Sequence, residues 1–329
     1  MKKLGSKILL FSLFLTVFSL PLSVQAGDYP TRAIKAIVPW GPGSGSDVYA
    51  RGLTGEAAKY LGQPLAITNM GGAGGTRGAN YVAKSKPDGY TVMITSQSCM
   101  TIYPNIAAKP AYTLNDFTPI CLFGLNPRVF VARSDAPWNS VKEVLEDARK
   151  NPGKIRMTTV GITSWGAFAY YGLKDAYPNA EFVPIHLGGT QKSVLAILRG
   201  DADVMGGSHG ASKAQLDAGK FKAIGVAGET RSKFLPDVPT LKEQGVELRS
   251  DFTIFAAAVP KGTPEEAVVK LEQSFRAMCQ DPITIERAQK IYFDLDFKGR
   301  KEAMEILSAD SAKYGRLAKK FDLKIKEKK

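Results

Sequence analysis

The sequence predicts an α/β protein of two lobes, each a mixed sheet flanked by helices, with a ligand cleft between the lobes. Short apolar segments alternate with segments of helical periodicity along most of the chain, which is typical of βα units. Glycines and hydroxyl residues follow many of the apolar segments, at the edge where open sheets bind ligands. Two extended apolar stretches, 117–133 and 251–259, lie where the chain would cross from one lobe to the other and back.

The two crossings divide the chain into a discontinuous lobe and an inserted one. With the break at Asn126-Pro127, residues 27–126 and 253–329 form lobe 1, and residues 127–252 form lobe 2. The segment 300–321 is amphipathic, and we expect its apolar face to pack within the molecule. That face consists of Ala303, Ile306, Leu307, Tyr314, Leu317 and Phe321.

Residues 1–26 have the pattern of a cleavable signal peptide. Lysines at positions 2, 3 and 7 precede an apolar segment, 8–20, which is too short to span a bilayer. The small residues Val24 and Ala26 predict cleavage after Ala26. No cysteine occurs directly after the apolar segment, near the predicted cleavage site, so we expect no lipid anchor. The mature chain is expected in the periplasm.

Charge limits the class of partner. The formal net charge is +13, and removal of residues 1–26, which hold three lysines and no acidic residue, lowers it to +10. A basic protein can attract nucleic acid, membrane surfaces or small anions. Export argues against nucleic acid, and the basic residues are dispersed apart from the C-terminal lysines at 324, 326, 328 and 329. The dispersed positive charge is consistent with a small anionic ligand, and equally with a protein whose charge serves only solubility.

Few side chains could hold a metal or cofactor. The three cysteines, Cys99, Cys121 and Cys279, allow at most one disulfide and match no metal or redox spacing. We expect buried thiols, with a bond between Cys99 and Cys121 left open. The chain has only two histidines, so we expect no metal site and no cofactor.

The first glycine-rich loop, VPWGPGSGSD at 38–47, joins a predicted strand, 33–38, to a predicted helix, 48–61. Asp47 stands where a helix N-cap is expected. Glycines let the backbone approach a ligand closely, and a helix N-terminus attracts anions. The loop is therefore either an anion-binding cradle or an ordinary βα turn.

Two more strands of lobe 1 end in similar loops. The strand 64–69 precedes MGGAGGTRGA at 70–79, which leads into a helix at 76–83, and the strand 90–95 precedes Ser96, Gln97 and Ser98. Neither glycine loop has the spacing of a dinucleotide-binding or P-loop motif. We therefore expect these loops to bind something other than a nucleotide.

Lobe 2 repeats the pattern. Ser140 and Glu143 form a predicted capping box before a helix at 141–150. Strands at 156–160, 181–185 and 201–205 precede the loops GITSWG, HLGGT and GGSHG, and a further strand is predicted at 221–227. Back in lobe 1, Thr263-Pro264-Glu265-Glu266 predicts a capped helix start with proline at its first position.

The strongest catalytic candidate is the G-x-S-x-G match at 206–210, which places Ser208 between a strand and a helix as in serine hydrolases. In that fold the histidine base follows the nucleophile well downstream, and here none follows His209. We therefore expect no enzyme, with a serine hydrolase using Ser208 as the alternative. The remaining pattern of glycine amides and hydroxyls suits carboxylate binding. Trp40 and Trp165 either flank an apolar part of the ligand or pack in the core.

Short segments along nearly the whole mature chain resemble the tripartite tricarboxylate transporter receptors, also called Bug receptors. Each segment is short, but together, and in the same order along the chain, they make the resemblance specific. The segments are Tyr29-Pro30, residues 37–47, Leu61-Gly62-Gln63-Pro64, residues 71–79, residues 87–91, residues 116–119, residues 151–154, residues 218–220, residues 235–240 and residues 259–264.

The resemblance implies a periplasmic binding protein type II fold and capture of a carboxylated metabolite for a membrane permease. We expect a monomer, and a sensor that presents its closed form to a signalling partner is a further alternative. The implied ligand-binding residues lie on loops of both lobes. They are Trp40, Gly43, Ser44, Gly45, Ser46, Asp47, Gly72, Ala73, Gly74, Ser96, Ser98, Thr163, Ser164, Gly189, Thr190 and Ser208.

Two positions depart from the family pattern. Residues 185–189 are Ile-His-Leu-Gly-Gly where the family often has Val-Pro-Tyr-Lys-Gly, and Gly207 stands where many members carry an acidic residue. An acidic side chain at 207 would suit the ammonium of an amino acid. Its replacement favours a di- or tricarboxylate or an aromatic acid as the ligand.

Overall fold

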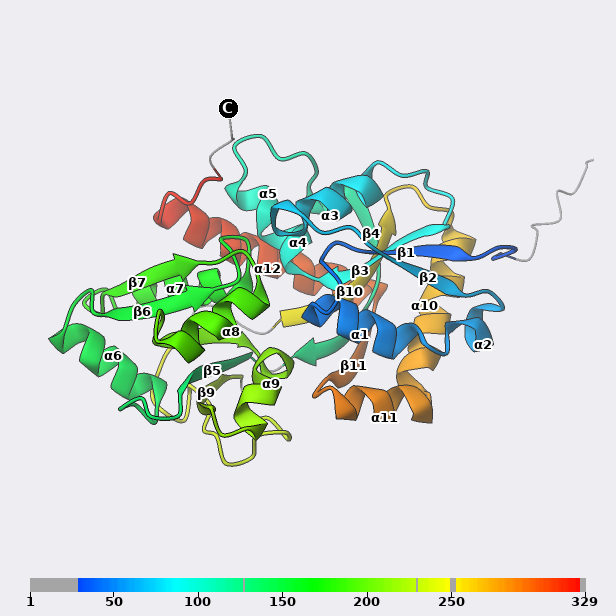
Figure 1. The fold of residues 1–329 in the computed structure, drawn as a ribbon. Coiled ribbons are helices and arrows are strands. Elements are labelled where there is room, and N and C mark those ends of the chain that lie inside the picture. Colours follow the sequence, from blue (N-terminus) through cyan, green and yellow to red (C-terminus); the bar gives the residue numbers. More distant parts are fainter. Residues whose placement is uncertain (1–28, 127, 229, 249–252, 326–329) are drawn as a thin grey trace, which may run out of the picture.

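Two sheets, each with its own helices, form two lobes that lie side by side (Figure 1). The computed structural model describes residues 29–126, 128–228, 230–248 and 253–325. This architecture confirms the predicted fold class. The predicted signal peptide lies outside the described residues, and none of the described helices is both long and apolar enough to cross a bilayer.

The sheet of lobe 1 has six strands in the order β11-β4-β10-β3-β1-β2. Three pair in parallel: β1 (Ile34–Val38), β2 (Leu65–Asn69) and β3 (Thr91–Ser96). The other three pair antiparallel: β4 (Phe117–Asn126), β10 (Thr253–Pro260) and β11 (Asp294–Gly299). The sheet is therefore mixed, as predicted.

Helices cover both faces of this sheet because its strands are apolar on both sides. One face, with Ile34 and Val38, packs on four helices, and the other, with Ile37, packs on two helices and short turns. The first group is α1 (Gly45–Thr54), α2 (Ala57–Leu61), α10 (Glu265–Gln280) and α11 (Pro282–Lys290). The second is α3 (Thr76–Ala83) and α12 (Arg300–Lys320), with the short α4 (Ser98–Thr101), α5 (Tyr103–Ile106), η1 (Ala73–Gly75) and η2 (Leu114–Asp116) nearby.

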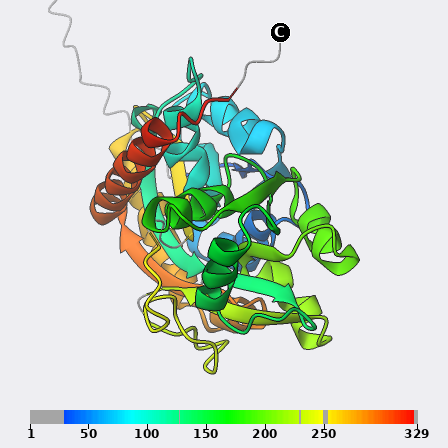
Figure 2. The ribbon, with the colours of Figure 1, turned by 90° about the vertical axis from the view of Figure 1, so that its left-hand side faces the viewer.

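The sheet of lobe 2 has five strands in the order β7-β6-β8-β5-β9. They are β5 (Arg128–Arg133), β6 (Ile155–Thr159), β7 (Phe182–His186), β8 (Val204–Ser208) and β9 (Phe221–Ala227). One face, with Phe130, packs on α6 (Val141–Lys150) and α7 (Trp165–Ala176). The other, with Val129, packs on α8 (Thr190–Arg199) and α9 (His209–Asp217). Figure 2 shows this lobe from its outer end.

The chain passes between the sheets twice, from β4 to β5 and from β9 to β10. The first apolar stretch that the sequence singled out contains β4 and β5 on either side of the first connection, and the described part of the second lies in β10, after the second connection. The exact lobe boundaries, 27–126 with 253–329 and 127–252, stay a prediction.

Two predicted helix starts differ from the structure. The N-cap of α1 is Ser44, whose Oγ accepts a hydrogen bond from the N–H of Asp47 at 3.3 Å, so the assignment of Asp47 as the cap was wrong. The Asp47 carboxylate instead accepts from other donors, described below. At α10 the cap is Pro264 with no side-chain hydrogen bond, because the Thr263 hydroxyl donates to the Pro260 carbonyl at 2.8 Å. The cap at Ser140 is confirmed, with Oγ 3.1 Å from the N–H of Glu143.

The sequence pattern also missed some breaks and elements. The helix predicted over 48–61 is two helices, α1 and α2, separated at Gly55 and Glu56. The strand β11 was not predicted, because its sequence DLDFKG is charged and each of its residues is only partly buried. All three cysteines are free and buried, and burial raises the pKa of Cys99 to about 12.

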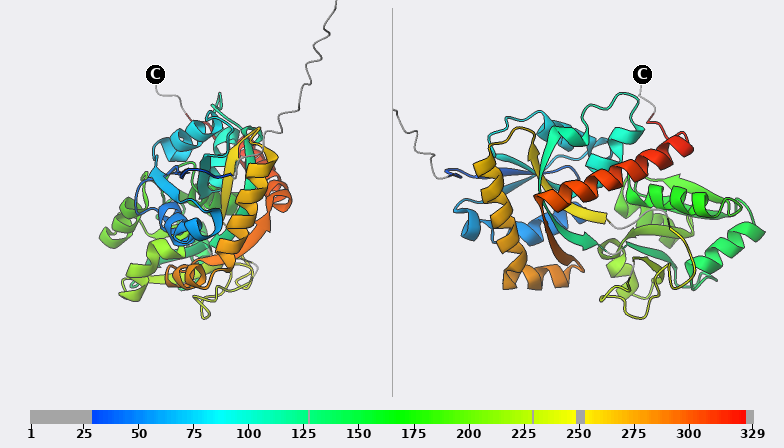
Figure 3. Two further views of the ribbon diagram at one scale, coloured as in Figure 1. Left: turned by 90° about the vertical axis from the view of Figure 1, so that its right-hand side faces the viewer. Right: turned by 180° about the vertical axis from the view of Figure 1, so that it is seen from behind.

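Helix α12 packs against both lobes. Its Tyr314 meets Phe168 of α7 edge to face, with ring centroids 4.9 Å apart, inside an apolar cluster with Ile102, Ile106 and Leu317. Near its C-terminal end Lys320 forms an ion pair with Asp175 of α7. Figure 3 shows the helix running along the back of the molecule from one lobe to the other. The expectation that this amphipathic helix packs within the molecule is confirmed.

This cluster yields a stability prediction. Phe168→Ala should lower the free energy of unfolding by about 3–5 kcal/mol, because it leaves a cavity at a fully buried position between α7 and α12. Urea unfolding followed by circular dichroism measures the change. Leu195→Ala on α8, where the side chain is 45% exposed, serves as the control and should change stability by less than about 1 kcal/mol. Equal effects of the two substitutions would contradict the packing role of Phe168.

Candidate functional site

A cavity of about 100 Å³ lies between the two lobes and is lined by residues from both. Its walls combine hydroxyls, glycines and aromatic rings. From lobe 1 they are Trp40, Ser44, Gly45, Ser46, Tyr49, Ser96, Ser98 and Phe255, and from lobe 2 Arg128, Val160, Ser164, Trp165, Gly166, Thr190, Met205, Gly206, Gly207, Ser208 and Ala211.

Beside the short α4, which starts at Ser98, four longer described helices begin at this cavity. Three of them, α1, α7 and α9, are capped by Ser44, Ser164 and Ser208, and each serine Oγ accepts a hydrogen bond from its own helix at 3.3 Å. Thr190, which also lines the cavity, is the first residue of α8. A helix N-terminus carries unpaired N–H groups and a partial positive charge. Since these N-termini come from both lobes, the cavity is suited to an anion.

Two of the serine hydroxyls keep a hydrogen available for a ligand. The Ser164 hydroxyl donates to the Gly161 carbonyl at 2.6 Å, so its hydrogen is already used. Ser44 and Ser208 accept from their helices, and no acceptor for their hydroxyl hydrogens occurs in the described part of the chain. Ser96 and Ser98 lie 3.0 Å apart, oxygen to oxygen.

The lobes approach closely at the edges of the cavity. The Thr163 hydroxyl of lobe 2 donates to the Gly74 carbonyl of lobe 1 at 3.4 Å. Gly74 has φ +67°, and a Cβ there would collide with the Thr163 side chain, so only glycine fits. A Cβ on Gly45 would lie 3.9 Å from Oγ of Ser208, which places the starts of α1 and α9 next to each other.

Asp47 braces the loop and does not line the cavity. Its carboxylate accepts hydrogen bonds from the N–H of Gly43, Nε of Arg51 and Nδ2 of Asn69, each at 2.9 Å. Burial opposes ionisation of this carboxyl, but the hydrogen bonds from Arg51, Gly43 and Asn69 outweigh it and hold its pKa below the ordinary value. Its charge is therefore balanced by Arg51 and shapes the loop.

Arg128 is the charged residue at the cavity that the sequence did not single out. It opens β5 directly after the crossing and faces the same side of the sheet as Phe130. Its guanidinium carbon lies 5.1 Å from the ring centroid of Trp165, and its Nε is buried without a hydrogen-bond partner. Burial lowers the pKa of Arg128 to about 10. No sequence signal could have placed it, because it precedes the continuous apolar run Val129–Ala132, which indicates only an extended segment.

The comparisons with known proteins identify the family. The model of the tripartite tricarboxylate transporter family receptor matches residues 49–323. The chain belongs to this family. A UPF0065 protein of Bordetella pertussis is 31% identical over 268 residues, which cover 80% of this chain and 81% of that protein. This confirms the resemblance found in the sequence.

Two solved structures show the same fold over nearly all of the receptor. The periplasmic binding protein BugD is 29% identical with a TM-score of 0.80, covering 90% of this chain and 99% of that one. MatC from Rhodopseudomonas palustris, solved with bound malate, is 26% identical with a TM-score of 0.78, covering 88% of this chain and 99% of that one.

The structure brings most of the expected site residues of the receptor together. Those that line the cavity are Trp40, Ser44, Gly45, Ser46, Ser96, Ser98, Ser164, Thr190 and Ser208. Seven others lie outside its lining: Gly43 and Asp47 in the braced loop, Gly72, Ala73, Gly74 and Thr163 around the edge where the lobes meet, and Gly189 as the cap of α8. Tyr49, Arg128, Met205 and Phe255 line the cavity without having been expected there.

The geometry gives Ser208 of the receptor no triad. Neither histidine ring hydrogen-bonds to Ser208 in the described residues: His186 Nδ1 lies 2.6 Å from the Thr159 hydroxyl, and the His209 ring stacks on Tyr292 with centroids 4.2 Å apart. The described residues also contain no group of three or more His, Cys, Asp or Glu that could hold a metal ion.

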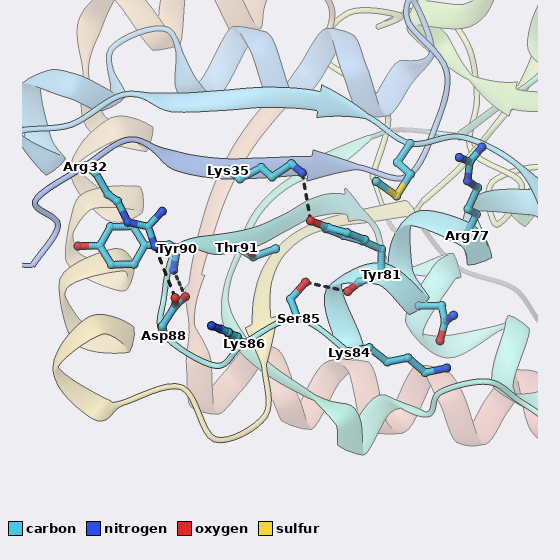
Figure 4. Close-up of a pocket in the computed structure, with 12 residues that line it drawn as sticks. Arg32, Lys35, Arg77, Tyr81, Lys84, Ser85, Lys86, Asp88, Tyr90 and Thr91 are labelled. Carbon is cyan, nitrogen blue, oxygen red and sulfur yellow. Dashed lines mark hydrogen bonds and ion pairs between the residues drawn. The ribbon is translucent and has the colours of Figure 1, made fainter.

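A second, wider hollow lies on lobe 1 beside β1 and α3 (Figure 4). It is basic, with Arg32, Lys35, Arg77, Lys84 and Lys86 among its lining residues. Two of these cations have partners, since Lys35 donates to the Tyr81 hydroxyl at 3.1 Å and Arg32 lies 3.5 Å from Asp88. Arg32, Arg77, Lys84 and Lys86 are exposed, so charge there is screened by solvent and salt. The cavity between the lobes is therefore the better candidate site.

The buried His209 should make the stability of the receptor depend on pH. Burial lowers its pKa from 6.5 to about 4, with smaller effects of Asp217 and Lys213. Between pH 4 and pH 6.5 the His209 side chain is therefore protonated in the unfolded chain but neutral in the folded chain. The free energy of unfolding accordingly decreases as the pH falls from 6.5 towards 4. Urea midpoints at about pH 7.5 and about pH 4.5 should differ less in His209→Gln than in the wild type. An unchanged difference would show that His209 plays no part.

Proposed function

We propose that the mature protein is a periplasmic receptor that captures a small carboxylated molecule between its lobes and delivers it to a membrane permease of the tripartite tricarboxylate type. The observation that carries the proposal is the convergence of helix N-termini from both lobes on one cavity. Family membership, the malate bound by MatC and the predicted signal peptide support it.

Capture follows from the division of donors between the lobes. The ligand would accept hydrogen bonds from the α1 N-terminus and Ser44 on one side and from the α9 N-terminus and Ser208 on the other. An anion between them is attracted by both positive helix ends, so it favours the closed arrangement. The contact of Thr163 with Gly74 closes the edge. The permease would recognise this closed form.

The lining favours an acid without an ammonium group. Among the described residues no carboxylate side chain lines the cavity, and the nearby Asp47 is balanced by Arg51. An amino acid would therefore bury its ammonium without a counter-charge, which is costly. Gly207, at the position where the family pattern often has an acidic residue, lines the cavity and adds none. The ligand is accordingly a di- or tricarboxylate or an aromatic acid, bound by a monomeric receptor.

Isothermal titration of the mature protein tests this function. The probes are citrate, succinate, malate, terephthalate and glutamate, titrated separately. We expect at least one of the first four to bind at one site per chain and to bind more tightly than glutamate. A preference for glutamate would contradict the ligand class, and binding of none of the acids would contradict the receptor function for this set of metabolites.

A serine substitution separates binding from catalysis. Ser208→Ala should weaken ligand binding about tenfold, since it removes one hydrogen-bond donor, and ester turnover should be negligible in both proteins. Ser140→Ala is the matched control, because it removes an equivalent helix cap on α6 outside the cavity lining and should leave affinity unchanged. Wild-type esterase activity that disappears in Ser208→Ala would instead support the hydrolase.

A further inference from the structure

Arg128 is the single charged side chain among the described residues that line the cavity, and it lies at the starts of two helices. In the sheet it pairs directly with Ser208, the cap of α9. Its guanidinium lies over the ring of Trp165, the first residue of α7. Directly opposed residues on neighbouring strands have their side chains on the same face. The cation is therefore fixed between two positive helix ends.

This placement is unfavourable unless an anion is present. A cation is destabilised at a helix N-terminus, where an anion is stabilised. No described carboxylate is among the groups that act on Arg128, and its buried Nε lacks a hydrogen-bond acceptor. Burial, and not a neighbouring cation, is what lowers its pKa. The folded chain thus holds a partly buried cation, paired with no described carboxylate, at a place where a negatively charged ligand would offset its charge.

We propose that Arg128 binds a carboxylate of the ligand directly and sets the charge that the receptor accepts. This rests on the proposed function. Guanidinium and carboxylate match as a bidentate pair, and the N-terminus of α9 at Ser208 supplies further donors to the same carboxylate. The rest of the ligand lies against the aromatic side chains of lobe 1, chiefly Trp40 and Phe255. The ligand class is an acid with a carboxylate at the lobe 2 end and a flat or apolar body.

The competing explanation is that Arg128 only holds Trp165 in place at the crossing between the lobes. The two explanations differ in their effect on the ligand-free protein. A structural arginine stabilises the fold, so its removal lowers the melting temperature. A binding arginine held at a cost does not, so removal leaves the ligand-free protein equally or more stable.

The experiment compares Arg128→Met and Arg128→Lys with the wild type, after unfolding and refolding of the mature protein to remove any copurified ligand. Arg133→Met, at the other end of β5 in an exposed ion pair with Asp135, is the matched control. Isothermal titration with citrate, succinate, malate and terephthalate measures affinity. Scanning calorimetry measures the melting temperature without ligand.

Arg128→Met should weaken binding of the best acid by about 100-fold or more, and Arg128→Lys about tenfold, because an ammonium keeps the charge and loses the bidentate geometry. Arg133→Met should bind like the wild type. The ligand-free melting temperature of Arg128→Met should be equal to that of the wild type or higher by about 1–4 °C.

Three outcomes would overturn the proposal. If the wild type binds an acid and Arg128→Met binds it within about threefold, Arg128 is not the charge partner, while the proposed function stands. If Arg128→Met or Arg128→Lys melts several degrees below the wild type without ligand, the role of the arginine is structural. If the wild type binds none of the four acids, the proposed function and this inference fall together.

Discussion

The polarity of the helices around the cavity is the constraint on which the site depends. Helices α1, α7, α8 and α9 each follow a strand of a parallel pair, β1, β6, β7 and β8, and a helix that follows such a strand starts at its carboxyl end. The carboxyl ends of these strands in the two sheets point towards the same cavity, so the positive N-terminal ends of the helices meet there. The potential of the cavity is thus a product of topology, and single side chains only adjust it.

Local patterns in the sequence were enough to predict much of this arrangement. Glycine and serine after each strand are local signals, and they pointed to Ser44, Ser96 and Ser208, which line one cavity in the structure. Asp47 was wrongly predicted as the N-cap of α1. Its carboxylate instead accepts hydrogen bonds from its neighbour Arg51 and the distant Asn69, and the pairing with Asn69 depends on the sheet. The helix cap at Ser140, which was predicted correctly, needed no such distant partner.

Arg128 shows what a single sequence does not reveal. The residue lies in a stretch whose composition indicates only an extended chain, and its surroundings come from α7 and β8, far along the sequence. The same holds for Tyr49 and Phe255, whose rings meet at 4.8 Å only because β10 returns to lobe 1. Long-range strand pairing determines which side chains lie next to each other in the cavity lining, whereas the local sequence pattern determines which loops contribute to the cavity.

Helix α12 restricts how the two lobes can move. Its Tyr314 and Leu317 share one apolar cluster with Phe168 of α7 and Ile102 of lobe 1. A rotation of the lobes that keeps this cluster packed must turn about an axis close to α12. The gap then widens on the opposite face, where α1, α8 and α9 lie nearest the viewer in Figure 1. In the proposed mechanism solute would enter from that face, while the surface along α12 would keep nearly the same shape.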